Sequence, residues 1–293
     1  MAKAIVGVIG GSGVYRLDGL TDVREERVPT PWGEPSDALR FGRIGGVEAA
    51  FLARHGQGHR LSPSTINYRA NIDALKRCGV TDLIGVSACG SFREELRPGL
   101  FVLIDQFVDR AFARQNSFFG AGCVAHVSMA RPIAPLLSRR IADSAEKEGI
   151  ACRRGGTYLC MEGPQFSTLA ESLDYQSRGL DVIGMTDATE AQLAREAEMS
   201  YATIAMVTDS DCWHEVHGAV DVPAVIQVMK DNAHRVNALL ARVLGDFPAE
   251  HEPCPIGSDR ALDGAIITRP EARDPQLMRK LEAIVARVVA SGG

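Results

Sequence analysis

Short, nearly continuous apolar runs alternate along the chain with longer segments in which apolar residues recur every three or four positions. The short runs are typical of buried strands, and the periodic segments are typical of amphipathic helices. Strands are predicted over residues 4–10, 47–56, 81–91, 99–109, 156–166, 180–186 and 201–211. Helices are predicted over residues 62–79, 130–149, 188–198, 221–245 and 275–290. This alternation predicts an α/β protein, a single domain with a central mixed β-sheet flanked by helices.

The first predicted helix has recognisable end signals. Ser62 can cap its N-terminus, Pro63 suits the first turn, and Gly79 can end it. These signals place the helix over residues 62–79.

The last 45 residues differ from the rest of the chain. Proline and charged residues become dense at 247–260, which predicts a linker. We therefore expect one domain over residues 1–248, and a linker with a C-terminal helical extension over 249–293. The terminal helix has an apolar stripe that must be buried on its own or a neighbouring subunit. The stripe comprises Leu277, Leu281, Ile284, Val285 and Val288.

Most predicted strands end in small or polar residues. The endings read "GGSG", "ARHG", "SACGS", "EGPQFS", "GMT" and "TDSD". Ligands of open α/β sheets bind beyond the carboxyl ends of the strands. Six such endings at one edge of a sheet predict a single pocket.

Several of these endings favour an anion. The "GGSG" turn offers backbone N–H groups and the Ser12 hydroxyl, although such turns are often purely structural. It has neither the GxGxxG spacing nor the lysine of a P-loop. Arg54 cannot lose its charge and would need an anion if buried, while His55 and Thr186 add further polar groups. Together these groups suit phosphate or a sulfate-like anion.

Asp209 and Asp211 follow the last apolar strand run. A metal site is disfavoured because no third ligand lies nearby at a suitable spacing. The pair could instead cap a helix, or accept hydrogen bonds from an amino group and a ring N–H. If both carboxylates face one pocket, their repulsion should raise the pKa of one.

Composition excludes several classes of function. The chain has 293 residues with a formal net charge of -5 and no basic run longer than two residues, so nucleic-acid binding is not expected. We expect neither a signal peptide nor a membrane span. The seven scattered cysteines suit reduced thiols and a cytoplasmic location. The pair His214 and His217 lacks further ligands, so no metal is expected.

Several motifs, taken in order, resemble a known family. They read "IGGSG", "ARHG", "NYRANI", "SACGS", "EGPQFST", "GMT" and "TDSDCW", together with "IDQF" followed by "DR". From about residue 5 to 245 the sequence resembles the 5′-methylthioadenosine phosphorylases, in the trimeric branch of the purine nucleoside phosphorylase superfamily. The resemblance implies the nucleoside phosphorylase fold and a homotrimer with active sites near subunit interfaces.

The resemblance also implies a reaction and a set of site residues. Phosphate cleaves 5′-methylthioadenosine to adenine and 5-methylthioribose 1-phosphate, with no metal or organic cofactor. The residues implied for phosphate are Ser12, Arg54, His55, Ala88 and Thr186. Those implied for the nucleoside are Met185 under the ribose, Phe166 and Ser167 beside the base, and Asp209 and Asp211 facing the adenine. His126, Val222 and Val225 would line the methylthio end, closed by a neighbouring subunit's C-terminal segment.

The resemblance explains the paired aspartates. Superfamily members that act on 6-oxopurines have an asparagine where the base is read, whereas a carboxylate accepts hydrogen bonds from an amino group. Asp209 is interpreted as the acid that protonates the leaving base, with Asp211 positioning it and the 6-amino group. Cys212 has no base partner and is not expected to act as a nucleophile.

The sequence also departs from the family. Relatives often have a "VPE" stretch after the "MT" motif, whereas here the sequence reads "MTDATE". Asp187 is expected to point outward and cap the following helix, because a charge directed inward would oppose phosphate. The family match fades after about residue 250, and Leu277 or Leu281 could enter a neighbour's pocket.

Two other functions stay open at this point. One is a phosphorylase that prefers methylthioinosine, adenosine or inosine. The other is a non-catalytic nucleotide- or anion-binding protein of the same fold.

Overall fold

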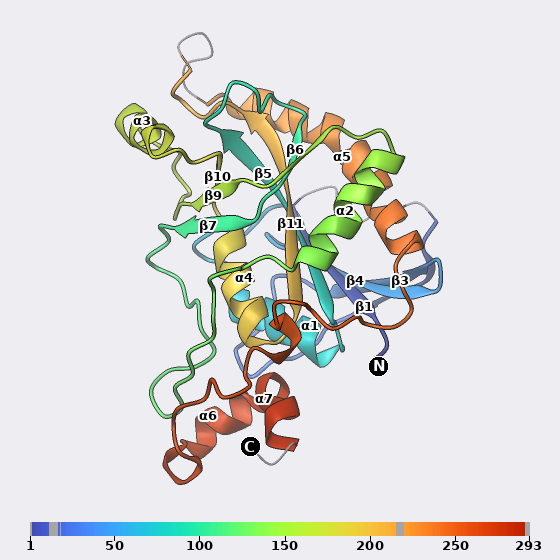
Figure 1. The fold of residues 1–293 in the computed structure, drawn as a ribbon, viewed down its shortest axis with the longest axis vertical. Helices are drawn as coiled ribbons and strands as arrows, with labels where there is room; N and C mark the ends of the chain where they lie inside the picture. The colour runs from blue at the N-terminus through green and yellow to red at the C-terminus, as the bar shows by residue number, and fades with distance from the viewer. Residues whose placement is uncertain (1, 12–16, 18, 215–219, 291–293) are drawn as a thin grey trace.

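The chain folds around one large β-sheet with helices on both sides (Figure 1). The structure is a computed structural model, and it describes residues 2–11, 17, 19–214 and 220–290. The described strands are β1 (Ile5–Gly10), β2 (Thr21–Glu26), β3 (Leu39–Ile44), β4 (Val47–Ala53), β5 (Asp82–Ser91), β6 (Phe101–Leu103), β7 (Gln106–Asp109), β8 (Cys152–Arg154), β9 (Thr157–Cys160), β10 (Val182–Gly184) and β11 (Ser200–Asp209). The described α-helices are α1 (Tyr68–Arg77), α2 (Pro135–Lys147), α3 (Leu169–Ser177), α4 (Asp187–Glu196), α5 (Val222–Gly245), α6 (Pro275–Lys280) and α7 (Glu282–Ala290). The predicted α/β class and mixed sheet are confirmed.

The sheet is organised around β5. Its main path runs β2-β3-β4-β1-β5-β10-β9-β7, and β11 pairs with the other side of β5. Strands β4, β1, β5 and β11 are mutually parallel, so their carboxyl ends meet at one edge of the sheet. Strand β10 runs antiparallel to the last residues of β5. Residues 184–186, at and just after the end of β10, therefore lie beside the same edge of the sheet.

The helices cover this parallel centre. Helix α1 packs with α4 and α2 packs with α5, and α4 and α2 lie on opposite sides of β11 in Figure 1. Residues 200–208 of β11 are all buried, as expected for a parallel strand covered on both faces.

Some predicted boundaries are wrong because local signals did not reveal tertiary partners. Helix α1 begins at Tyr68, because Asn67 caps it by accepting a hydrogen bond from the Ala70 N–H at 3.1 Å. The strand predicted over 99–109 divides into β6, which pairs with β11 and β8, and β7, which pairs with β9. The helix predicted over 275–290 divides into α6 and α7 at Leu281.

Four elements were not predicted. Strand β2 is exposed at all six positions and shows no alternation of apolar and polar residues, and β3 pairs with it. Strand β8 has only three residues. Helix α3 has few apolar residues, although Thr168 and Glu171 form a capping box at its start.

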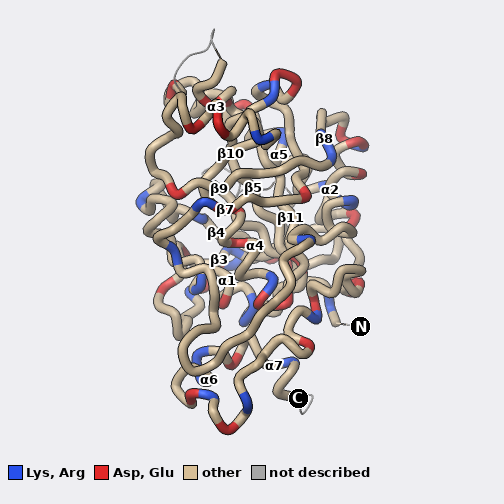
Figure 2. The backbone as a smooth tube through the Cα atoms, turned by 60° about the vertical axis from the view of Figure 1, so that its left-hand side comes forward, with Lys and Arg blue, Asp and Glu red and all other residues tan. Residues whose placement is uncertain are grey.

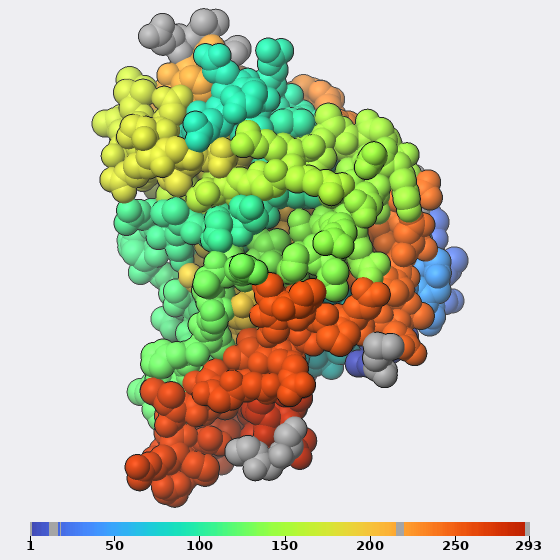
Figure 3. Space-filling view, in the orientation of Figure 1, coloured from blue at the N-terminus to red at the C-terminus, as the bar shows by residue number. Residues whose placement is uncertain are grey.

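The C-terminal segment folds onto its own subunit, where α6 and α7 form the lobe at the bottom of Figure 3. Leu281, Ile284 and Val285 are buried, and α7 packs on α1. Arg287 donates hydrogen bonds to both oxygens of Glu198, at 2.8 and 2.6 Å. Three residues of the apolar stripe are therefore buried within the chain, while Leu277 and Val288 are partly buried against the same core. The expectation that Leu281 could enter a neighbour's pocket is wrong, because its side chain is buried in its own subunit.

Charges of both signs are interspersed along the backbone (Figure 2). Among the described residues, no helix is both long and apolar enough to cross a membrane. The same part of the chain contains no group of three or more His, Cys, Asp or Glu side chains that could hold a metal ion.

Candidate active site

A pocket of about 450 Å³ lies beyond the carboxyl ends of the central strands. Residues after β1, β4, β9 and β10, and at the ends of β5 and β11, line it, and α5 adds an apolar wall. The predicted site residues that line the pocket are Arg54, His55, Ala88, Phe166, Met185, Thr186, Asp209, Asp211 and Val225. The six strand endings therefore converge on a single pocket, as the sequence predicted.

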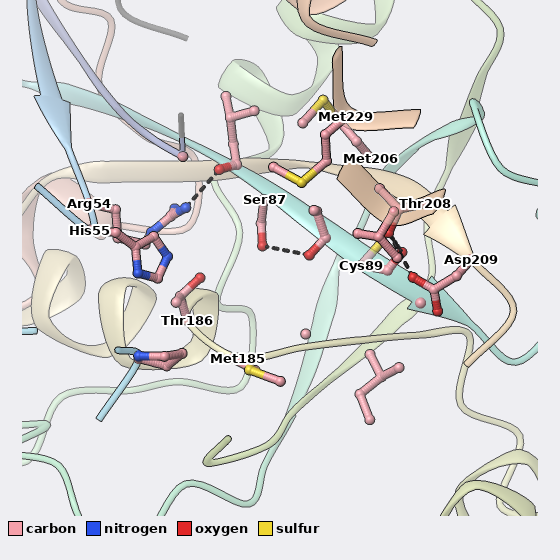
Figure 4. Close-up of a pocket in the computed structure, with 18 of the residues that line it drawn as sticks. Arg54, His55, Ser87, Cys89, Met185, Thr186, Met206, Thr208, Asp209 and Met229 are labelled. Carbon is pink, nitrogen blue, oxygen red and sulfur yellow. Dashed lines mark hydrogen bonds between the residues drawn. The ribbon is translucent and has the colours of Figure 1, made fainter. Parts of the chain in front are cut away.

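The pocket has two polar ends. Figure 4 shows Arg54, His55 and Thr186 grouped at one end, with Asp209 at the other. We call the first group, Arg54, His55 and Thr186, the anion end, and Asp209 with Asp211 the carboxylate end. Met185 lies between the two ends.

Arg54 has an anionic partner within its own chain. Its side chain is only 2% exposed, and Glu190 accepts hydrogen bonds from Nε at 2.5 Å and from Nη2 at 2.9 Å. The carbonyls of Val86 and Ile9 accept two more, at 2.7 and 3.3 Å. These four hydrogen bonds occupy four of the five N–H groups of the guanidinium, so among the described residues only one N–H remains for a bound anion. Arg54 therefore contributes mainly fixed positive charge.

His55 is held in one orientation. Its Nδ1 lies 2.8 Å from the Leu61 carbonyl, and its ring stacks on His59 with centroids 4.2 Å apart. Burial, the nearby Arg54 charge and His59 lower the pKa of His55 to about 4. The ring is therefore neutral at neutral pH. Because a carbonyl can only accept, Nδ1 carries the proton and Nε2 is an acceptor.

Asp187 points inward, so the expectation of an outward, helix-capping orientation is wrong. The residue is fully buried in the first turn of α4. Its carboxylate accepts hydrogen bonds from the hydroxyls of Thr186 at 2.9 Å and Thr203 at 2.7 Å. Arg54 Nη2 lies 3.6 Å away. These partners explain why a charged side chain can be buried at this position.

The two aspartates at the carboxylate end are held differently. Asp209 accepts hydrogen bonds from the Asp211 N–H and from the Thr208 hydroxyl, both at 2.8 Å. Asp211 is 4% exposed, and its Oδ2 has no hydrogen-bond partner among the described residues. Burial raises the pKa of both carboxyls, and the Asp209 charge further raises the pKa of Asp211. The expected repulsion is therefore present, although burial is the larger cause.

Three of the predicted residues that the structure describes do not line the pocket, and a fourth predicted residue is not described. Ser12 lies outside the described residues. Ser167 is absent from the lining, and its carbonyl accepts a hydrogen bond from the Cys212 thiol at 3.4 Å. Val222, at the start of α5, is 50% exposed, and His126 is exposed on a loop whose backbone bonds to Ala265.

Other lining residues were not predicted. Ser87 lies between the two ends of the pocket, where its hydroxyl donates to the Ala88 carbonyl at 3.2 Å (Figure 4). It belongs to the "SACGS" ending, so its hydroxyl was an available signal. Met206, Met229 and Val236 add apolar surface from β11 and α5. These residues look like ordinary core positions in the sequence, and only the fold shows that they line the pocket.

The chain belongs to the phosphorylase superfamily, whose family model matches residues 5–245. It is 64% identical to S-methyl-5′-thioadenosine phosphorylase of Bradyrhizobium diazoefficiens, over 99% of each chain. It is 58% identical to the protein of the same name from Cereibacter sphaeroides, over 98% of this chain and 99% of the relative.

Solved structures are similar as well. A methylthioadenosine phosphorylase from an antarctic soil metagenomic library has a TM-score of 0.90 and 43% identity, over 97% of this chain and 99% of that one. A methylthioadenosine phosphorylase from Schistosoma mansoni in complex with adenine has a TM-score of 0.80 and 37% identity, over 85% of this chain and 93% of that one.

Proposed function

We propose that this protein is an S-methyl-5′-thioadenosine phosphorylase. It cleaves 5′-methylthioadenosine with inorganic phosphate, giving adenine and 5-methylthioribose 1-phosphate, as in methionine and purine salvage. The observation that carries this proposal is the single pocket with an anion end and a carboxylate end. The names of its relatives support the same reaction.

The two ends divide the chemistry between them. Phosphate at the anion end lies near the positive charge of Arg54 and attacks the sugar carbon as the glycosidic bond breaks. The sugar develops positive charge as this bond breaks, and the Met185 side chain packs beneath it. Phe166 lines the base side of the pocket. Phosphate binding is proposed for Ala88 and Ser12 as well.

Adenine is a poor leaving group as an anion, so it must gain a proton as it departs. We assign this proton to Asp209, because burial raises the pKa of its carboxyl and the Asp211 N–H holds it in place. We assign the hydrogen bond from the 6-amino group of adenine to Asp211, whose Oδ2 has no hydrogen-bond partner among the described residues, although the nearby Ser172 and Ser167 side chains act to lower its pKa. General acid catalysis of this kind typically contributes about 10²–10⁴-fold in rate.

The protein is also proposed to be a cytoplasmic homotrimer that needs no metal or organic cofactor and binds no nucleic acid. Large apolar side chains are exposed near the pocket mouth, on and before α3 and on the first turns of α5. They are Phe166, Leu169, Leu173, Val222 and Ile226. A neighbouring subunit covering this surface would bury them and close the methylthio end beside Val222 and Val225.

The test is adenine release from 5′-methylthioadenosine with and without inorganic phosphate, beside methylthioinosine and adenosine. Phosphate-dependent release with a preference for methylthioadenosine is expected. Faster turnover of methylthioinosine would contradict the roles of Asp209 and Asp211. Equal rates without phosphate would indicate a hydrolase. A parallel assay in a chelator tests the absence of a metal, and light scattering gives the number of subunits.

A further inference from the structure

Among the described residues, two carboxyl groups lie against one guanidinium beneath the anion end, and burial together with the nearby Asp187 raises the pKa of one of them, Glu190. Arg54 is the cation, and Asp187 and Glu190 are the two carboxylates that contact it. None of the three side chains is more than 2% exposed, so solvent screens them poorly. Within the described part of the chain, a bound anion therefore meets the Arg54 guanidinium, which is already paired with Glu190 and lies 3.6 Å from Asp187.

The hydroxyl of Thr186 is directed away from the ligand. It has one hydrogen, and it donates this hydrogen to Asp187 Oδ1 at 2.9 Å. The other Asp187 oxygen is held by the Thr203 hydroxyl at 2.7 Å, so the carboxylate cannot turn away without losing that bond. Thr186 Oγ1 is therefore an acceptor toward the pocket.

His55 presents a second acceptor. Its Nδ1 proton is used by the Leu61 carbonyl, which leaves a lone pair on Nε2. Two of the residues assigned to phosphate therefore accept hydrogen bonds instead of donating them. Such groups suit an anion that carries its own O–H groups.

We infer that Asp187 makes this site select the monoanion of inorganic phosphate over the dianion. The inference rests on the proposed function, since it concerns the phosphate that the reaction consumes. The monoanion has two O–H groups, which donate to Thr186 Oγ1 and His55 Nε2. It also carries one negative charge fewer against the Asp187 carboxylate. Asp187 acts through Thr186 and is a positioning residue.

The other titratable groups around Asp187 do not offset its charge. They are Tyr158 and Cys160 of β9, Tyr201 of β11 and Cys89 of β5. Burial raises the pKa of each one, to about 12 for Cys160, so all four are neutral at the pH of any assay. Arg54 is thus the cation that faces Asp187 among the described residues.

The first experiment measures the KM for total phosphate of the wild-type protein between about pH 6 and about pH 8.5. Once the dianion dominates, KM should rise by up to about tenfold per pH unit. Sulfate has no O–H group in this range, so it should inhibit poorly relative to phosphate analogues that keep a proton. A flat or falling KM, or inhibition by sulfate at concentrations near the KM for phosphate, would overturn the inference.

The second experiment uses Asp187→Asn. The amide can donate to Thr186 Oγ1, which frees the hydroxyl to donate to phosphate, and one buried negative charge is removed. The KM for phosphate near pH 8.5 should fall by about tenfold, with a smaller change near pH 6. Asp82→Asn is the matched control, because it removes a carboxylate at the first residue of β5, whereas the pocket is lined by later residues of this strand. Equal changes in both variants would contradict the inference.

Calorimetry with inorganic phosphate alone separates this inference from the proposed function. Binding of phosphate that weakens at high pH in the wild type, and weakens less in Asp187→Asn, supports the inference without any turnover. A protein that turns over methylthioadenosine with phosphate but binds phosphate equally at both pH values keeps the proposed function and loses the inference. Absence of phosphate-dependent turnover would count against the proposed function itself.

Discussion

Replacing Glu190 by glutamine tests the ion pair beneath the pocket. The wild-type carboxylate chelates Arg54 at 2.5 and 2.9 Å, and both side chains are almost fully buried. Glutamine keeps the shape but removes the charge, so Arg54 is left with Asp187 at 3.6 Å as its anionic partner. Breaking a buried pair from one side typically costs about 3–5 kcal/mol. Because Asp187 remains, we expect a loss of about 3 kcal/mol in the free energy of unfolding.

The assay is denaturant unfolding of wild type and Glu190→Gln, with and without phosphate. Asp143→Asn is the control, because it breaks an exposed pair with Arg154 and should cost less than about 1 kcal/mol. Phosphate should stabilise Glu190→Gln more than the wild type, since Arg54 then has greater need of an external anion. A variant within about 1 kcal/mol of wild type, or one that phosphate stabilises less, would refute this account of Arg54.

Three further predictions concern single groups. The hydrogen bond to Asp82 raises the pKa of His251 in the folded state. The pair therefore stabilises the fold fully below the unfolded histidine pKa of about 6.5, and this stabilisation is lost as the pH rises through the folded pKa. Unfolding of His251→Asn should therefore differ most from wild type near pH 5.5 and least near pH 9. Burial raises the pKa of Glu196 to about 7. The free energy of unfolding should therefore decrease as the pH rises from about 4.5 to about 7, because the folded state keeps a proton that the unfolded state has lost. Glu196→Gln should abolish this decrease in stability. An unchanged pH dependence of unfolding in the variant would contradict the raised pKa of Glu196. Asp209→Asn should lower kcat for methylthioadenosine by roughly 10²–10⁴-fold with less effect on methylthioinosine, and equal losses on both substrates would argue against base recognition.

Much of the pocket follows from local sequence pattern. Runs such as residues 4–10 and 201–211 are apolar at consecutive positions, which is the property of a strand buried on both faces. Their polar endings mark the carboxyl ends of strands, and a parallel sheet brings those ends to one edge. The position of Asp209 and Asp211 at a pocket wall could therefore be predicted. The roles of individual residues came from family resemblance, and they stay predictions where the pocket alone does not test them.

Elements with weak periodicity escaped prediction. Among the described strands, the exposed β2 pairs only with β3 at the edge of the sheet, so burial imposes no alternation on it. Whether the stripe on α7 would be buried on its own chain or on a neighbour could not be predicted either. An apolar stripe requires a partner surface but carries no information about which one.

The electrostatics of the anion end depended on tertiary structure alone. The sequence by itself determined that Arg54, Thr186 and Asp187 follow strands whose ends converge. It could not determine that Arg54 pairs with Glu190, 136 positions away, or that Asp187 turns inward. A residue in the first turn of a helix can face solvent or core. Its direction is decided by partners from other strands, here Arg54 after β4 and Thr203 on β11. Periodicity depends only on residues that are close in sequence. The charge that a ligand meets depends on all the segments that the fold brings together, including segments far apart in the sequence.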